Sequence, residues 1–131
     1  MPEYTLETHI FTTANHCIKN DGPKTTRHLN GTVQLVLTMP DNQPHRADVA
    51  KMQVHRRARR RGVGAALLRA IEAEAHSAGR TLLVLDTVTG SDAERLYSSL
   101  GWQRRGVIPD DALWPRGGLC STTVFYRQLE A

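Results

Sequence analysis

The feature that most constrains the fold is a unit between residues 47 and 78, in which an apolar stretch is followed by an arginine-rich loop, two glycines and a long amphipathic segment. Ala47–Val54 has a near-continuous apolar face with the β-branched residues Val49 and Val54, which predicts a buried strand. From Val63 onward, apolar residues recur at helical spacing as far as Ala78, and Gly79 is a plausible C-cap. A strand, a short loop and a helix in this order predict a mixed α/β domain.

Asp48 is the exception within the predicted strand. Strict alternation places Ala47, Val49 and Lys51 on one face of the strand, with Asp48, Ala50, Met52 and Val54 on the other. A carboxylate in a buried strand needs a partner or a chemical role.

The loop before the helix reads Arg59-Arg60-Arg61-Gly62-Val63-Gly64. A helix N-terminus has unpaired amides and the positive end of the helix dipole, so it attracts phosphate. Glycines let an anion approach the backbone, and arginines add charge-assisted hydrogen bonds. The sequence therefore predicts a diphosphate site built mainly from backbone. The chain has no G-x-x-x-x-G-K-[ST], and Leu67 breaks a G-x-G-x-x-G pattern.

The pattern R-x-x-G-x-G from Arg59 to Gly64, after a strand that ends Met52-Gln53-Val54, resembles motif A of the GNAT N-acetyltransferase superfamily, which binds acetyl-CoA. The resemblance continues through a following strand, Leu82–Asp86, and through the A-x-x-L-Y-x-x-x-G-[FW] pattern from Ala93 to Trp102. It covers roughly residues 31 to 129 and is most similar to the tabtoxin-resistance type of acetyltransferase.

The resemblance implies a GNAT fold, which is α/β (mixed α+β). Its central mixed, largely antiparallel sheet is splayed between two parallel strands and flanked by helices. Residues 31–131 would form the acetyltransferase domain and 1–30 a variable segment. The N-terminal helices that normally cover part of the sheet and line the acceptor pocket are shortened or absent from this sequence. An exposed sheet edge or face would favour a homodimer.

The patterns of the other segments complete the predicted element order. Strands are expected at Gly31–Met39, Thr81–Asp86, Trp102–Val107 and Ser121–Leu129, with a helix capped by Ser91 or Asp92 that runs to about Leu100. Ile108–Leu119 is expected to be a loop. Near the N-terminus, Tyr4, Leu6 and Ile10 suggest one strand, and Asn20–Pro23 a turn.

The resemblance also implies residue roles for cofactor binding. Main-chain groups of the Met52–Val54 strand end would hold pantetheine, and amides from Arg59 to Gly64 would hold the diphosphate. Gly90 stands where many family members have an asparagine that contacts the cofactor, so Ser91 is expected to make that contact. The candidate cofactor-binding residues are Met52, Gln53, Val54, Arg59, Arg60, Arg61, Gly62, Val63, Gly64 and Ser91.

Three residues are candidates for catalysis. Tyr97 matches the family tyrosine that protonates the departing thiolate, with a packed core tyrosine as the alternative. Asp86 and Asp48 could each orient or deprotonate the acceptor amine, and burial would raise the pKa of either carboxylate towards that of a useful base. The alternatives are a strand-end cap for Asp86 and a salt bridge to Arg46 or Lys51 for Asp48.

These features predict an acetyl-CoA-dependent N-acetyltransferase that moves an acetyl group to a primary amine of a small molecule by direct attack in a ternary complex. The alternatives are a degenerate CoA-binding module without turnover and a basic nucleic-acid-binding module. The formal charge of +4 resides largely in the arginine loop, and a phosphorylated cofactor explains it better than nucleic acid does. We expect no metal site, no membrane association and a cytoplasmic location. The two cysteines are expected to be free thiols.

Overall fold

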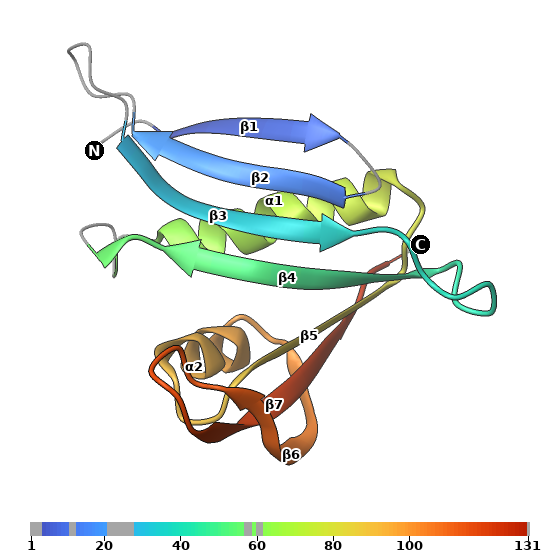
Figure 1. Ribbon diagram of the computed structural model, residues 1–131. Coiled ribbons are helices and arrows are strands. Elements are labelled where there is room, and N and C mark those ends of the chain that lie inside the picture. Colours follow the sequence, from blue (N-terminus) through green and yellow to red (C-terminus); the bar gives the residue numbers. More distant parts are fainter. Residues whose placement is uncertain (1–3, 11–12, 21–27, 57–58, 60–61, 131) are drawn as a thin grey trace.

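The computed structural model describes residues 4–10, 13–20, 28–56, 59 and 62–130. Its elements in chain order are β1 Tyr4–Ile10, β2 Thr13–Asn20, β3 His28–Val36, β4 Arg46–Val54, α1 Val63–Ser77, β5 Leu82–Val88, α2 Asp92–Ser99, β6 Gln103–Leu113 and β7 Leu119–Gln128. The strands form one seven-stranded sheet in the order β1-β2-β3-β4-β5-β7-β6, as Figure 1 shows. The predicted mixed α/β class is confirmed.

The strand directions also agree with the prediction. Every neighbouring pair in the sheet is antiparallel except β4 and β5, which are parallel and connected through α1. Parallel neighbours need a crossover of this kind, because a tight turn can only join antiparallel strands.

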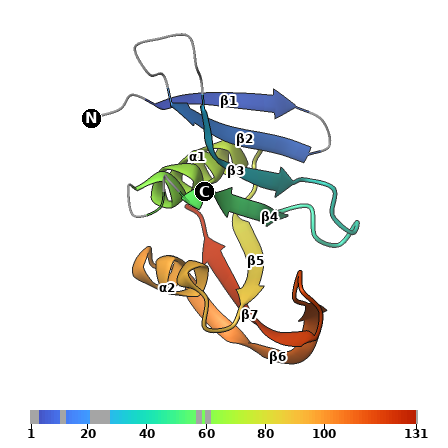
Figure 2. The same ribbon diagram turned by 60° about the vertical axis from the view of Figure 1, so that its left-hand side comes forward.

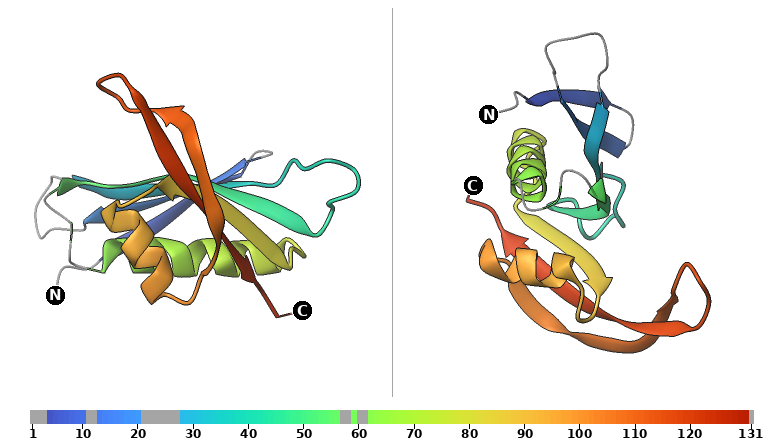
Figure 3. Two further views of the ribbon diagram at one scale, coloured as in Figure 1. Left: turned by 90° about the horizontal axis from the view of Figure 1, so that it is seen from below. Right: turned by 90° about the vertical axis from the view of Figure 1, so that its left-hand side faces the viewer.

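Both helices lie on the same side of the sheet (Figures 2 and 3). Helix α1 packs mainly against β3, with further contacts to β2 and β4, and α2 contacts β5. The buried core comes from both helices and from the strand faces that they cover. Its largest fully buried side chains, from α1 and the strands, are Phe125, Leu35, Leu67, Leu68, Ile71 and Leu83.

A β-bulge in β4 corrects the predicted faces of that strand. Lys51 has a φ of 52°, and the register against β3 advances by three residues on β4, from Ala50 to Gln53, but by only two on β3. The extra residue turns Met52 and Val54 to the helix side, where both pack against the core that also contains Val49. The strict alternation that grouped Met52 and Val54 with Asp48 was therefore wrong, because alternation fails across a bulge.

The N-terminal part forms an antiparallel hairpin of β1 and β2, in which Ile10 pairs with Ala14. Only two residues separate the strands, too few for a helix, which confirms the predicted loss of helices at this place. The sequence predicted a single strand here and missed β2, whose residues TANHCIKN are mostly polar. Most of the predicted turn Asn20–Pro23 lies outside the described residues. Among those described, no helix covers the second face of the sheet (Figure 3).

The hairpin of β6 and β7 is longer than predicted. Strand β6 continues to Leu113, and the segment predicted as a loop is accommodated by an irregularity between Ile108 and Ala112, where Asp110 has a φ of 50°. Proline and aspartate are tolerated here because β6 is an edge strand, whose outer backbone groups need no partner strand. Strand β3, by contrast, ends earlier than predicted, at Val36 rather than Met39.

Candidate functional site

The parallel strands β4 and β5 are paired only at their beginnings. The pairs are Arg46 with Leu82, Ala47 with Leu83 and Asp48 with Val84. Beyond them, β4 continues beside β3 as far as Val54, while β5 continues beside β7 as far as Val88. The two strands therefore diverge, and Figure 1 shows the opening between β4 and β5.

A groove of ≈ 1310 Å³ lies beside this opening, on the helix side of the sheet. Its walls come from the end of β4, the first turn of α1 and the exposed stripe of α2. The residues that line it are Gly31, Thr32, Met52, Gln53, Val54, His55, Arg59, Gly62, Val63, Gly64, Ala65, Ser91, Asp92, Ala93, Arg95, Leu96 and Ser99. The volume exceeds the range of roughly 300–1,000 Å³ that is usual for small-ligand pockets, so the groove has room for a large ligand.

The N-terminus of α1 opens into the groove without a competing cap. Gly62 is the N-cap, has a φ of 76° and no side chain of the described residues caps this end; the first turn contains no acidic residue. The first hydrogen bond of the helix runs from the Ala66 amide to the Gly62 carbonyl, so the preceding amides have no intrahelical acceptor. A helix start of this kind suits an anion, and the binding of a diphosphate here stays a prediction.

Glycine is favoured at three positions around the groove, each for a different structural reason. A Cβ on Gly62 would meet no atom within 4 Å, so its positive φ, rather than crowding, favours glycine. A Cβ on Gly64 would lie 2.7 Å from Cδ2 of Leu96, so this glycine lets α2 close against α1. Gly31, which the sequence did not single out, lets α1 approach β3, since its Cβ would lie 3.0 Å from Cδ1 of Leu67 and from Cγ1 of Val63.

Eight of the ten predicted cofactor-binding residues line this one groove, and the remaining two, Arg60 and Arg61, lie outside the described residues. The sequence missed the contribution of α2. Its groove-lining residues Asp92, Arg95, Leu96 and Ser99 recur at spacings of three and four, a helical stripe that could have been found.

The turn between β5 and α2 is fixed by a capping network. Ser91 is the N-cap, and its Oγ accepts a hydrogen bond from the Glu94 amide at 3.2 Å. In return, Glu94 Oε2 accepts from the Gly90 amide at 2.7 Å and from Oγ1 of the fully buried Thr123 at 3.1 Å. These bonds hold the α2 wall of the groove against β7.

Tyr97 is buried, with its ring between Trp102 and Phe125 at centroid distances of 5.9 and 5.7 Å. Its hydroxyl donates towards the sulfur of Met52, which lies 3.7 Å away and lines the groove. Burial, and secondarily the carboxylate of Asp86, raises the pKa of Tyr97 to about 12. The phenol therefore stays protonated at neutral pH and can act as a hydrogen-bond donor to sulfur.

The two candidate aspartates lie on the opposite face of the sheet. Asp48 of β4 pairs with Val84 of β5, so these two side chains share a face of the sheet. Asp86 lies two residues after Val84 in β5 and therefore lies on that same face, which no described helix covers. Asp48 is half-buried and accepts from Arg46 Nε at 2.9 Å, which is the ion pair named as its alternative. Asp86 is exposed.

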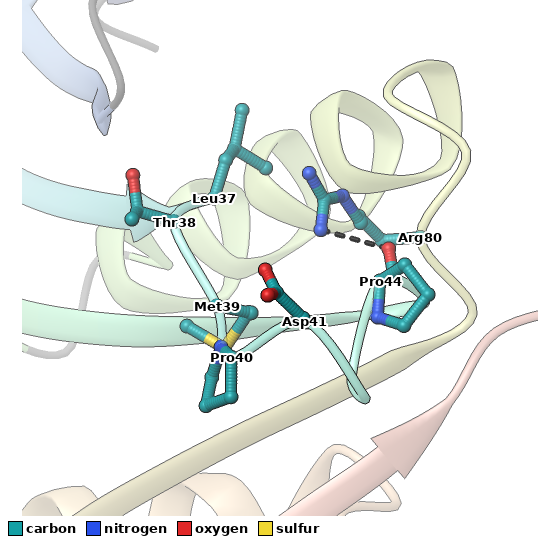
Figure 4. Close-up of a pocket in the computed structure, with 7 residues that line it drawn as sticks. All are labelled: Leu37, Thr38, Met39, Pro40, Asp41, Pro44 and Arg80. Carbon is teal, nitrogen blue, oxygen red and sulfur yellow. Dashed lines mark hydrogen bonds between the residues drawn. The ribbon is translucent and has the colours of Figure 1, made fainter.

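A second, smaller pocket of ≈ 310 Å³ lies at the far end of α1, between Leu37 and Pro44 (Figure 4). Nη1 of Arg80 donates to the Pro44 carbonyl at 2.8 Å and to the Arg46 carbonyl at 3.0 Å. These bonds fasten the β3–β4 loop to the end of α1. The pocket is remote from the groove.

Other classes of site lack support among the described residues. They contain no group of three or more side chains suited to metal binding, and no helix long and apolar enough to cross a membrane. Cys120 is a buried free thiol.

Solved structures with the same fold cover most of this chain. The yncA protein of Salmonella typhimurium, solved with its cofactor acetyl-CoA, has a TM-score of 0.75 at 20% identity over 90% of this chain and 65% of its own. A GCN5-related N-acetyltransferase from Kribbella flavida has a TM-score of 0.73 at 26% identity, over 90% and 68%. The ribosomal-protein-S18-alanine N-acetyltransferase of Escherichia coli has a TM-score of 0.74 at 17% identity, over 94% and 73%.

The chain thus spans about two thirds to three quarters of the length of these structures. The family described as "Acetyltransferase (GNAT) domain" matches residues 15–104, which is more than half of the sequence. The chain therefore belongs to the GNAT acetyltransferase family.

Proposed function

We propose that the protein is an acetyl-CoA-dependent N-acetyltransferase that acetylates a primary amine of a small molecule by direct attack in a ternary complex. The observation that carries this proposal is the uncapped N-terminus of α1, which faces a groove beside two diverging parallel strands. The residues fit the cofactor: amides and Arg59 suit the diphosphate, and the end of β4 offers main-chain groups for pantetheine. When bound, acetyl-CoA supplies the activated acetyl group.

The proposed role of Tyr97 is hydrogen bonding to the departing sulfur. A phenol with a pKa of about 12 is a weaker acid than an ordinary thiol of pKa ~8.5, so complete proton transfer to a thiolate is uphill by about 5 kcal/mol. A hydrogen bond needs no such transfer. The Met52 sulfur now accepts it at 3.7 Å, and the Met52 side chain would have to turn aside for a substrate sulfur to take its place.

Asp86 is the better of the two carboxylates for receiving the amine, because Asp48 already pairs with Arg46. An exposed carboxylate attracts a protonated amine and can accept its proton through water. A cationic small-molecule acceptor follows from this proposal. We also propose, on the sequence resemblance, that the protein is of the tabtoxin-resistance type.

Acetyl-CoA binding followed by turnover tests the function. We expect acetyl-CoA at 100 times its Kd to stabilise the purified protein by about 2.7 kcal/mol, and a panel of amines to release free thiol. Absence of both binding heat and thermal stabilisation with acetyl-CoA would contradict the proposal.

A degenerate CoA-binding module is the second candidate, favoured by the two-residue connection between β1 and β2 and by the lack of a helix over one sheet face among the described residues. Binding of acetyl-CoA without turnover on any amine would support it.

We further propose that residues 31–131 form the acetyltransferase domain, with residues 1–30 as a variable segment. A cytoplasmic homodimer in which a second copy covers the bare face is also proposed, and light scattering tests the association.

A further inference from the structure

We propose that Arg95 of α2 determines specificity for the ribose phosphate of coenzyme A, the third phosphate of that molecule, separate from the diphosphate at the N-terminus of α1. The inference rests on the proposed cofactor. It names a residue that neither the GNAT motif nor the sequence patterns single out.

Two walls of the groove each provide an arginine. Arg59 comes from the loop before α1, and Arg95 comes from α2 on the other side. Among the described lining residues, these are the only two arginines. One phosphate site at the α1 amides therefore leaves a separate guanidinium on the α2 wall.

The position of Leu96 locates Arg95 relative to the α1 amides. Cδ2 of Leu96 lies only 2.7 Å from where a Cβ on Gly64 would be, so Leu96 borders the first turn of α1 directly. Arg95 is its neighbour in the chain, and consecutive helical residues are about 100° apart around the axis. The Arg95 side chain is 72% exposed, whereas Leu96 is half-buried, so Arg95 lies on the outer part of the same wall.

The present partner of Arg95 can be exchanged. Its Nη2 pairs with Oδ1 of Asp92 three residues earlier, and the Asp92 side chain is 83% exposed. Exposed pairs of this kind contribute little, because water solvates both charges. A phosphate carries more charge than a carboxylate and accepts both arms of a guanidinium, so it would displace Asp92.

The test compares the affinity of the purified protein for coenzyme A with its affinity for the same molecule without the ribose phosphate, by titration calorimetry. We expect the wild type to prefer coenzyme A by roughly three- to tenfold. Arg95→Ala should remove this preference while leaving the affinity for the dephosphorylated molecule within about twofold. Arg116→Ala is the matched control, since it removes an equal charge from the exposed β6–β7 turn, outside the groove.

Each result has a distinct meaning. If neither molecule binds, the proposed function fails together with the inference. If the wild type binds both equally, or Arg95→Ala weakens both equally, the function stands and the role of Arg95 is wrong. A loss of preference in Arg116→Ala as large as that in Arg95→Ala would attribute the effect to overall charge and also overturn the role.

Asp92→Asn provides a second measurement. It removes the carboxylate that competes for Arg95, so the preference for coenzyme A should rise about two- to threefold. An unchanged or lower preference would contradict the exchange of partners.

Discussion

The two faces of the sheet differ in which described elements cover them. On the helix side, β4, α1 and α2 together enclose a groove, and a capping network through Glu94 and Thr123 holds the α2 wall in place. On the opposite side, Asp86 is exposed and Asp48 is engaged by Arg46, with no described helix over them. Among the described residues, the proposed cofactor groove therefore has walls from three elements, whereas no helix covers the proposed acceptor side.

This difference has a physical cause. The β4 and α1 part of the groove depends on local features, namely a bulge, a glycine turn and a helix start, which are encoded within a short stretch of chain, whereas its α2 wall depends on a contact between the two helices. The acceptor side depends on elements that cover the sheet, and the β1–β2 hairpin leaves no room for them. Binding and acceptor recognition should consequently be separable by mutation.

The largest expected effect is that of Ala65→Glu, which breaks the cofactor half alone. Ala65 lines the groove in the first turn of α1, where a carboxylate interacts favourably with the helix dipole, by about 0.3–1 kcal/mol. The same carboxylate repels a diphosphate, so acetyl-CoA affinity should fall at least ~100-fold. Calorimetry and thermal unfolding measure both. Ala65→Gln, of equal size and no charge, is the control, and an equal loss of binding in it would indicate steric blocking instead.

Tyr97→Phe should lower the rate of turnover and leave the binding of acetyl-CoA unchanged. We expect kcat to fall by roughly 10- to 100-fold, since one hydrogen bond to the departing sulfur is lost, while the Kd of acetyl-CoA changes less than twofold. The ring still packs between Trp102 and Phe125 in this variant. Steady-state kinetics with calorimetry separates the two quantities. An unchanged kcat would make Tyr97 a core residue only.

The two aspartates sharpen the comparison on the acceptor side. Asp86→Asn should lower kcat/KM for a cationic amine by about tenfold, because the exposed carboxylate attracts the amine. Asp48→Asn should change kcat/KM little and lower the free energy of unfolding by at most about 1 kcal/mol, since it breaks a partly exposed ion pair with Arg46. Kinetics on one amine in both variants decides between them, and a reversed order would identify Asp48 as the group that receives the amine.

The sequence predicted what depends on local pattern. The helix that begins at Val63, the absence of a side-chain cap at its start among the described residues, and the capping of α2 by Ser91, one of the two caps predicted, all follow from short-range chemistry. The side chain of Met52 was assigned to the wrong face, because a bulge at Lys51 leaves no mark in the alternation of polarity. Strand β2 was missed since polar residues carry little strand signal on their own.

The candidate site shows the same division. Residues of one motif converge in the groove, but the role of Leu96 against Gly64 is a contact between two helices that no spacing within either helix predicts. The exposure of Asp86 likewise depends on what covers the sheet elsewhere. Long-range coverage, rather than local propensity, is what the sequence could not provide.

The smallest expected effect is that of the Asp86 charge, on the proposed acceptor side, on the pKa of Tyr97, which lies on the groove side. Burial is the larger cause of its raised pKa and the charge of Asp86 the smaller. Removing that charge in Asp86→Asn makes ionisation of the phenol easier, so the pKa should fall by less than about one unit. Spectrophotometric titration of tyrosinate checks this, with Tyr97→Phe identifying the signal.

The sign of the linkage to stability follows from the same shift. The pKa of Tyr97 is raised above the unfolded value of 10.0, so its contribution to stability is fully present below pH 10 and is lost as the pH rises towards about 12. Tyr97→Phe should lack this component of the alkaline decline in unfolding free energy, and Asp86→Asn should show a slightly smaller one. The opposite result would be an unchanged pKa of Tyr97 in Asp86→Asn. It would mean that the carboxylate exerts no electrostatic effect across the opening between β4 and β5, and that the proposed acceptor side is electrostatically isolated from the groove.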